Sequence, residues 1–317
     1  AIQWGHNNDG FFGPSGVGIA DADIDAIEAW EITTGQTVSP EGVNEVVIAI
    51  IDSGVDFNNP DLTANAWHNP REIPDNQIDD DGNGLVDDYF GYDFADLDSD
   101  PTDTQGHGTH VAGTVGAVGN NQLFVTGVNW NTKIMALRAG DAGLSSAALL
   151  GSYNYIVEQK LLGVNIVASN NSYGGSPASG IDRFAISATI DAGILFVAAS
   201  GNDAANNDVT QFFPSGYDLD GILAVGASDS AEQVAIFSSN GAASVDIHAP
   251  GVDILSTRPP QLGFVDFLDG TSMASPHAAG VAGLLGDLAP GASPIDIKAW
   301  IMAGTDVKPV FAGLSVT

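Results

Sequence analysis

An aspartate, a histidine and a serine occur in three short glycine-bearing segments, and these residue types suit nucleophilic catalysis. They are Asp52 in Ile-Asp-Ser-Gly-Val-Asp, His107 in Gly-His-Gly-Thr-His-Val-Ala-Gly and Ser272 in Gly-Thr-Ser-Met-Ala. A serine hydroxyl becomes a nucleophile when a histidine removes its proton and a carboxylate orients that histidine. Ser272 precedes an apolar helical run over 274–288, so backbone N–H groups at a helix N-terminus could stabilise an oxyanion beside it.

Each segment also has an ordinary structural interpretation. Asp-Ser-Gly is good turn chemistry and serine is a common helix N-cap, so Asp52 and Ser272 indicate little when each is taken alone. His107 and His110 are three residues apart, which is conceivable for a metal-binding pair. The segment lacks the glutamate and the i,i+4 spacing of zinc-protease helices, and we interpret His110 as a structural histidine.

Taken together, in the order Asp, His, Ser, the three segments make residues 46–288 resemble the subtilisin-like serine proteases, or subtilases. The resemblance implies that Ser272 is the nucleophile, that His107 is the general base and then the general acid, and that Asp52 orients the imidazole. Asn202, in Ala-Ala-Ser-Gly-Asn, matches the asparagine of the family's oxyanion hole. Without the other motifs, an ordinary left-handed turn would be the preferred explanation of this asparagine.

The same resemblance implies an extended cleft for a peptide substrate. Ser172, Tyr173 and Gly174 resemble the segment that pairs with the substrate, and the segment that begins at Gly140 resembles the opposing strand. The substrate would join as a strand between them, where glycines allow a second backbone to approach closely. Phe212 stands where many relatives have glycine at the floor of the first specificity pocket, which favours medium or small side chains before the cleaved bond.

An acidic stretch predicts a calcium site. Its alternating oxygen ligands, a glycine for the turn and a following carbonyl resemble the first part of an EF-hand loop. The ligands that we expect are Asp79, Asp81, Asn83, the carbonyl of Leu85, and Asp87. Phe90 stands in place of the bidentate glutamate, so the loop is not a complete EF-hand. Because five carboxylates within ten residues repel one another, we favour bound Ca²⁺ over a bare solvated loop.

The resemblance implies a second calcium site in the segment 119–125, which interrupts the helix after the catalytic histidine. Its implied ligands are Gln3, Asp61, Gly119, Asn121, Leu123 and Val125. A plain turn would also explain Asn121, and a charge at a helix N-terminus would also explain Asp61. We therefore expect two or more structural calcium ions.

The composition limits the classes of partner. The chain has 317 residues, and its 40 Asp and Glu against 8 Lys and Arg give a formal net charge of −32. Nucleic-acid binding needs clustered Lys and Arg, so we expect no nucleic-acid partner. The acidic excess suits divalent cations, a solvated surface, or both. Cysteine is absent, which removes a disulfide scaffold and a thiol nucleophile, and no apolar run is long enough to predict a membrane span.

Strand-like and helical patterns alternate along the chain. Short continuous apolar runs, typical of strands buried on both faces, occur at 46–51, 165–168, 194–198, 222–225 and 245–247. Helical patterns occur at 22–30, 145–160 and 181–192. The alternation predicts an α/β fold with a doubly wound, mostly parallel sheet flanked by helices, as in subtilisin-like proteases. We expect a single catalytic domain over 1–317, in which the Asp-, Asn- and Pro-rich stretch at about 58–103 is a calcium-binding insertion.

These observations predict a secreted, extracellular, calcium-stabilised serine endopeptidase that hydrolyses proteins or peptides. We expect a monomer without a membrane partner, and the resemblance implies maturation with its own propeptide; whether the precursor continues beyond Thr317 stays open. Two alternatives stay open. A catalytically silent module of the same fold would not be labelled by a fluorophosphonate at Ser272, and a processing protease of narrow specificity would not digest casein.

Overall fold

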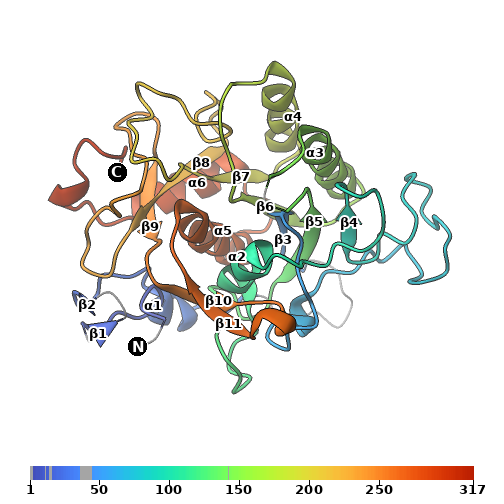
Figure 1. Ribbon diagram of the computed structural model, residues 1–317, viewed down its shortest axis with the longest axis horizontal. Coiled ribbons are helices and arrows are strands. Elements are labelled where there is room, and N and C mark those ends of the chain that lie inside the picture. The colour runs from blue at the N-terminus through green and yellow to red at the C-terminus, as the bar shows by residue number, and fades with distance from the viewer. Residues whose placement is uncertain (1–2, 11, 14–15, 36–44, 142) are drawn as a thin grey trace.

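A parallel sheet forms the centre of the computed structural model, which describes residues 3–10, 12–13, 16–35, 45–141 and 143–317. Its seven strands are β3 (Val47–Asp52), β4 (Gly91–Asp93), β5 (Lys133–Arg138), β6 (Ile166–Asn171), β7 (Leu195–Ala199), β8 (Ile222–Ser228) and β9 (Ile247–Pro250). They lie in the order β4-β5-β3-β6-β7-β8-β9, and every neighbouring pair is parallel (Figure 1). From β3 the chain crosses to the β4 edge, returns through β5, and then continues on the other side of β3 through β6, β7, β8 and β9, so the direction of winding reverses once.

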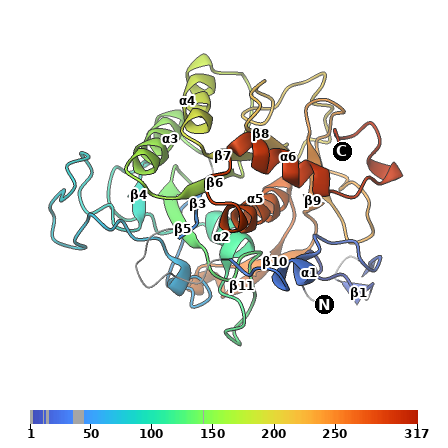
Figure 2. The same cartoon turned by 180° about the vertical axis from the view of Figure 1, so that it is seen from behind.

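Helices cover both faces of the sheet. The helices α2 (His107–Gly116), α5 (Thr271–Leu288) and α6 (Pro294–Gly304) pack on one face, and α3 (Ser146–Leu161) and α4 (Gly180–Asp191) lie on the other (Figures 1 and 2). Alternate residues of β3 enter the two cores, because successive side chains of a strand point to opposite faces. Ile48 and Ile50 pack in the core that contains α2 and α5, whereas Ile51 packs in the core that contains α3.

The remaining elements lie outside the central sheet. They are β1 (Phe12–Gly13), β2 (Gly16–Val17), α1 (Ala26–Trp30), β10 (Ile254–Thr257), β11 (Val265–Leu268) and the short 3₁₀ turns at Thr63–Asn65, Pro260–Leu262 and Pro309–Phe311. The strands β10 and β11 form an antiparallel hairpin that packs against α2. Among the described residues, no helix is both long enough and apolar enough to cross a membrane.

The doubly wound parallel fold that the sequence predicts is confirmed. The five predicted strands correspond to β3, β6, β7, β8 and β9, with ends that differ by at most three residues. The pattern analysis missed β4 and β5. The strand β5 has six residues, and its four fully buried apolar residues between Lys133 and Arg138 form a run as long as those predicted at 165–168 and 222–225, so the pattern analysis overlooked a readable signal. The strand β4 has only three residues, which is too short for a pattern.

The stretch at 58–103 joins β3 to α2 and contains β4. β4 pairs with β5 at the edge of the sheet, where Gly91 lies opposite Ala136. The chain before β4 projects as a loop beside this edge (Figure 1). Most residues of the loop over 73–87 are exposed or half-exposed, so it adds little to either apolar core.

Candidate active site

The predicted catalytic side chains lie at the end of one strand and at the beginnings of two helices. Asp52 is the last residue of β3, His107 is the first residue of α2, and Ser272 is the second residue of α5. The carboxyl ends of parallel strands are where open α/β sheets place their ligands. Gly108 allows the close approach of β3 and α2, because a Cβ there would lie 2.2 Å from the carbonyl oxygen of Gly54.

Asp52 and His107 form a direct side-chain pair. The Nδ1 of His107 lies 2.7 Å from Oδ1 of Asp52, which is 3 % exposed, whereas the His107 side chain is 29 % exposed. A proton on Nδ1 that is donated to the carboxylate leaves Nε2 with its lone pair, which is the tautomer required of a general base. Asp52 Oδ1 also accepts a hydrogen bond from the N–H of Ser53.

The electrostatics of the pair favour the protonated imidazole. Burial alone would lower the pKa of His107, but the charge of Asp52 and its hydrogen bond outweigh burial, and the pKa is raised above its usual value. A raised pKa stabilises the imidazolium that forms when histidine accepts a proton from serine. By contrast, burial lowers the pKa of His110 to about 3, and its Nε2 donates to the carbonyl of Ile254, so His110 has the environment of a structural residue.

Asp103 supports this pair from the end of the long 58–103 stretch. Its carboxylate accepts five hydrogen bonds, from the Ser53 hydroxyl, the N–H groups of Gln105, Gly106 and Thr109, and the Thr109 hydroxyl. The Ser53 hydroxyl in turn accepts the N–H of Gly108. Asp103 therefore fixes the N-terminus of α2, and with it the backbone that carries His107. The motif analysis missed this residue, since its segment shows only turn chemistry.

Ser272 is presented at the N-terminus of α5. Its hydroxyl donates to the carbonyl oxygen of Ser172 at 3.1 Å, so proton transfer to His107 requires the hydroxyl to leave this partner. The side chain of Ser172 ties the two segments together, because its hydroxyl donates to the carbonyl of Ser272 at 2.8 Å. The structure thus joins the predicted nucleophile to the predicted substrate-binding segment.

Asn202 lies beside the same helix end. Its Oδ1 accepts hydrogen bonds from the N–H and the hydroxyl of Thr271, both at 2.9 Å, and this fixes the amide orientation. The Asn202 Nδ2 and the backbone nitrogen of Ser272 each lie 3.5 Å from the point that a Cβ on Gly270 would occupy. Two donors therefore border one small space, which is the requirement for an oxyanion hole. The sequence analysis missed Thr271, whose orienting contact no spacing pattern reveals.

A cleft of about 720 Å³ lies beside these side chains and is lined by Asp52, His107, Ser172, Tyr173 and Gly174, among others. Gly143 and Leu144 also line it. Gly140 lies at the base of this second segment, where it forms a β-bridge with Leu144. The structure therefore brings the predicted substrate-binding segments to one cleft. The ring of Phe212 lies against Gly174 and Gly201.

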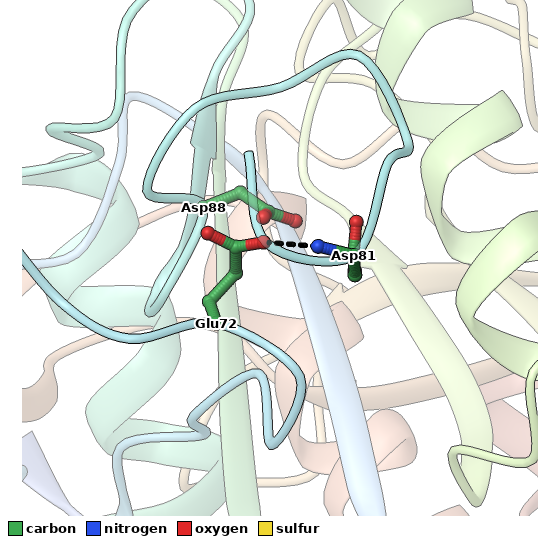
Figure 3. Close-up of side chains that lie close together, drawn as sticks. All are labelled: Glu72, Asp81 and Asp88. Carbon is green, nitrogen blue, oxygen red and sulfur yellow. Dashed lines mark hydrogen bonds between the residues drawn. The ribbon is translucent and has the colours of Figure 1, made fainter. Parts of the chain in front are cut away.

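Three carboxylates lie close together at the acidic loop, and the motif analysis predicted only one of them, Asp81, as a ligand. Oxygens of Glu72, Asp81 and Asp88 lie within 4.8 Å of one another (Figure 3). Glu72 and Asp88 each have one buried oxygen without a hydrogen-bond partner. Burial raises the pKa of both these carboxyl groups. Asp88 follows a predicted ligand directly, but Glu72 lies outside the repeating pattern, so only the fold brings it to the loop.

The other predicted ligands of this loop make contacts within the protein. Asp79 accepts the N–H groups of Gly82, Asn83 and Gly84, and Asp87 accepts those of Asn76 and Gln77. The side chain of Asn83 accepts the N–H of Leu85 and donates to Asp88. Asp81 is therefore the residue that the pattern and the carboxylate cluster share.

The structure also brings together most of the residues of the second predicted calcium site. Asp61 accepts the side-chain amide of Asn121 at 2.9 Å and the N–H of Val125 at 2.9 Å. Gln3 pairs through its amide with the backbone of Thr126. The side chain of Leu123 is half-exposed, and Gly119 packs against Trp130. Hydrogen-bond donors contact both oxygens of Asp61, so calcium ligation at this site stays a prediction.

Comparisons with known proteins agree with this geometry. Residues 43–311 match the model of the family described as the subtilase family. The chain is 37 % identical over 257 residues to a thermophilic serine proteinase of a Bacillus species, a match that covers 81 % of this chain and 54 % of the relative. It is 34 % identical to thermitase of Thermoactinomyces vulgaris, with coverage of 86 % and 83 %.

A solved structure of a psychrophilic protease superposes on the fold. Its TM-score is 0.68 at 30 % sequence identity, and the match covers 82 % of each chain. Against the first of the sequence relatives, by contrast, the chain spans about half of the length. The family model covers most of the described fold, including the elements that carry Asp52, His107 and Ser272. The chain therefore belongs to the subtilase family.

Proposed function

We propose that this chain is a serine endopeptidase that cleaves proteins and peptides through an acyl-enzyme on Ser272. The observation that carries the proposal is the 2.7 Å contact between His107 Nδ1 and Asp52 Oδ1, in a cleft that is also lined by Ser172, whose carbonyl oxygen accepts the hydroxyl of Ser272. This contact leaves the imidazole oriented and its Nε2 available as a base. The family model and the named serine proteinases among the relatives support the same activity.

The reaction proceeds in two half-reactions. His107 Nε2 removes the hydroxyl proton of Ser272 as Oγ attacks the scissile carbonyl carbon. The carbonyl oxygen becomes an oxyanion that accepts hydrogen bonds from Asn202 Nδ2 and from the N–H of Ser272. His107 then donates its proton to the amine nitrogen as the C–N bond breaks. A water molecule, deprotonated by His107, attacks the acyl carbon and releases a carboxylic acid and the serine hydroxyl.

Labelling with a fluorophosphonate tests this function. We expect stoichiometric, irreversible modification of the native chain at Ser272, digestion of casein, and neither reaction in Ser272→Ala. A catalytically silent module would remain unlabelled. A processing protease of narrow specificity would be labelled but would leave casein intact.

We also propose that a calcium ion binds between Glu72, Asp81 and Asp88. Ca²⁺ prefers carboxylate oxygens, and the two buried oxygens of Glu72 and Asp88 that accept no hydrogen bond suit coordination of a cation. The ion would neutralise three carboxylates that otherwise repel one another, and this would stabilise the folded chain. A thermal melt with added Ca²⁺ and with EDTA tests the proposal, since the melting temperature should rise with Ca²⁺ only while Glu72 and Asp88 are present.

We infer the cellular setting from the family, and the composition is compatible with it. We propose a secreted, extracellular monomer that acts on protein or peptide substrates after its propeptide is removed. The lack of cysteine and the net charge of −32 fit a soluble chain without a nucleic-acid partner. Detection of the active protein in culture medium, together with its mass in solution, tests this setting.

A further inference from the structure

The ring of Phe212 fills a gap between two backbone segments next to the catalytic groups. A Cβ built on Gly174 would lie 2.2 Å from Cε1 and 2.6 Å from Cζ of this ring. A Cβ built on Gly201 would lie 3.1 Å from its Cγ, Cδ2 and Cε2. One phenyl ring is thus enclosed by two glycines that are far apart in sequence, and neither position has room for a larger residue.

The two segments that enclose the ring also border the reacting groups. Gly201 directly precedes Asn202, the side-chain donor to the oxyanion. Gly174 lies two residues after Ser172, whose carbonyl oxygen accepts the hydroxyl of Ser272. When an acyl group is bound to Ser272 with its oxygen at Asn202, its α-carbon lies one bond from the carbonyl carbon. The side chain on that α-carbon is then within reach of the space between the two segments, where Phe212 lies.

The backbone around Phe212 is held in place. The N–H of Phe213 donates to the carbonyl of Gly175 at 2.9 Å, and the N–H of Gly175 donates to the carbonyl of Phe213 at 2.8 Å. The carbonyl of Phe212 accepts the N–H of Gly216 at 2.7 Å. The ring therefore moves only by rotation of its own side chain, and such a rotation would give up its contacts with both glycines.

We propose that Phe212 closes the pocket for the residue whose carbonyl is attacked, so that the enzyme cleaves after glycine, alanine or serine and discriminates against large side chains. This inference rests on the proposed peptidase function and specifies its substrate class. A large side chain at this position would have to displace a ring packed against Gly174 and Gly201, whereas a methyl or hydroxymethyl group would not.

Peptides that differ only in this residue test the inference. We expect kcat/KM to be higher for alanine than for phenylalanine by on the order of 100-fold, since a pocket distinguishes single methylene groups by about 10- to 200-fold. Phe212→Gly should raise the ratio of kcat/KM for phenylalanine over alanine by at least about tenfold. Phe184→Ala, which removes an exposed ring on α4, is the matched control and should leave the ratio unchanged.

The outcomes separate the two proposals. Best cleavage after phenylalanine or tyrosine by the native chain, or an unchanged ratio in a folded Phe212→Gly, would overturn the role of Phe212 while the peptidase function stands. No labelling of Ser272 and no cleavage of any peptide would overturn the peptidase function instead. If Phe212→Gly does not fold, Phe212→Leu and the native preference decide the question.

Discussion

The end of β3 and the acidic loop before β4 both depend on carboxylates, but the fold holds them in different ways. Asp52 ends a strand whose six residues are all buried and that lies inside the sheet, between β5 and β6. Glu72, Asp81 and Asp88 lie in or beside an insertion that is largely exposed and outside the apolar cores. Packing thus positions the catalytic carboxylate, whereas we propose that an ion positions the loop carboxylates. Substitutions at the first region should change rate, and those at the second should change stability.

Ser272→Ala should show the difference between the two regions most strongly, because it should greatly lower kcat and leave stability almost unchanged. Loss of the nucleophile should lower kcat by on the order of 10⁵- to 10⁶-fold, because the catalytic residues act as one unit. The melting temperature should stay close to that of the native chain, since the hydroxyl makes one hydrogen bond, to Ser172. Ser187→Ala on α4 is a control that should keep full activity. Comparable activity in the two variants would contradict the assignment of Ser272.

Asn202→Ala should have the next largest effect. Removal of one oxyanion donor costs about 10²- to 10³-fold in kcat, and KM should change little because the donor acts on the transition state. Steady-state kinetics on one peptide substrate measures both constants. A variant that raised KM with an unchanged kcat would place Asn202 in ground-state binding.

The pH dependence of kcat/KM tests how Asp52 and burial act against each other on His107. His107 must be neutral to accept a proton, and its raised pKa means that activity is lost as pH falls through a value above the usual one for histidine. Below that pKa, kcat/KM should fall by about tenfold per pH unit. Asp52→Asn should move this acid limb to lower pH, because it removes the charge that opposes burial. An acid limb that stays in place would contradict the electrostatic role of Asp52.

The same pKa shift has the opposite sign for stability. Because the folded-state pKa is raised, protonation of His107 stabilises the fold at pH values below the unfolded-state pKa. That contribution is lost as pH rises through the folded-state pKa. The pH range in which the enzyme is active is therefore the range in which this stabilisation is absent.

Removal of the metal ion should change kcat less than any of the substitutions in the catalytic region. With Ca²⁺ at 100 times its dissociation constant, the bound ion adds about 2.7 kcal/mol to the free energy of unfolding. EDTA should therefore lower the melting temperature by several degrees, while kcat at 20 °C below the transition changes by less than about twofold. Differential scanning calorimetry and a peptide assay on the same samples measure the two effects.

Paired variants show which carboxylates hold the ion. Glu72→Gln with Asp88→Asn should abolish the effect of Ca²⁺ on the melting temperature. Asp79→Asn with Asp87→Asn is the matched control, because these carboxylates accept backbone N–H groups instead of facing the cluster. A loss of the calcium effect in the control pair alone would favour the ligand set predicted from the sequence pattern.

The fold could be predicted, and the candidate catalytic residues could be proposed, because their signals are local. The apolar run of β3 and the motifs around Asp52, His107 and Ser272 each lie within a few consecutive residues. The contacts that complete the site join distant segments. Thr271 orients Asn202 across 69 residues, and Asp103 reaches Ser53 across 50. No spacing along the chain encodes such contacts, since they depend on how helices and strands pack.

The acidic loop also shows that spacing along the chain does not determine which contacts a side chain makes. Its alternating oxygens predict Asp79 and Asp87 as ligands, and in the structure these two carboxylates accept hydrogen bonds from N–H groups of the loop's own backbone. Glu72 enters the carboxylate cluster from outside the repeating pattern, where its carboxylate accepts the N–H groups of Asp80 and Asp81. Short acidic side chains readily bond to N–H groups a few residues away, and this competes with any ligand pattern read from spacing.

The five hydrogen bonds of Asp103 have a consequence for protein engineering. Four of them join the end of the 58–103 stretch to the start of α2, and the fifth joins it to Ser53, next to the end of β3. In addition, a Cβ on Gly54 would lie 2.3 Å from the carbonyl oxygen of Pro101, so the chain there is pressed against the end of β3. A designer could exchange the exposed part over 73–87 as a module. The final turn from Pro101 onward would have to be kept, because it belongs to the catalytic framework.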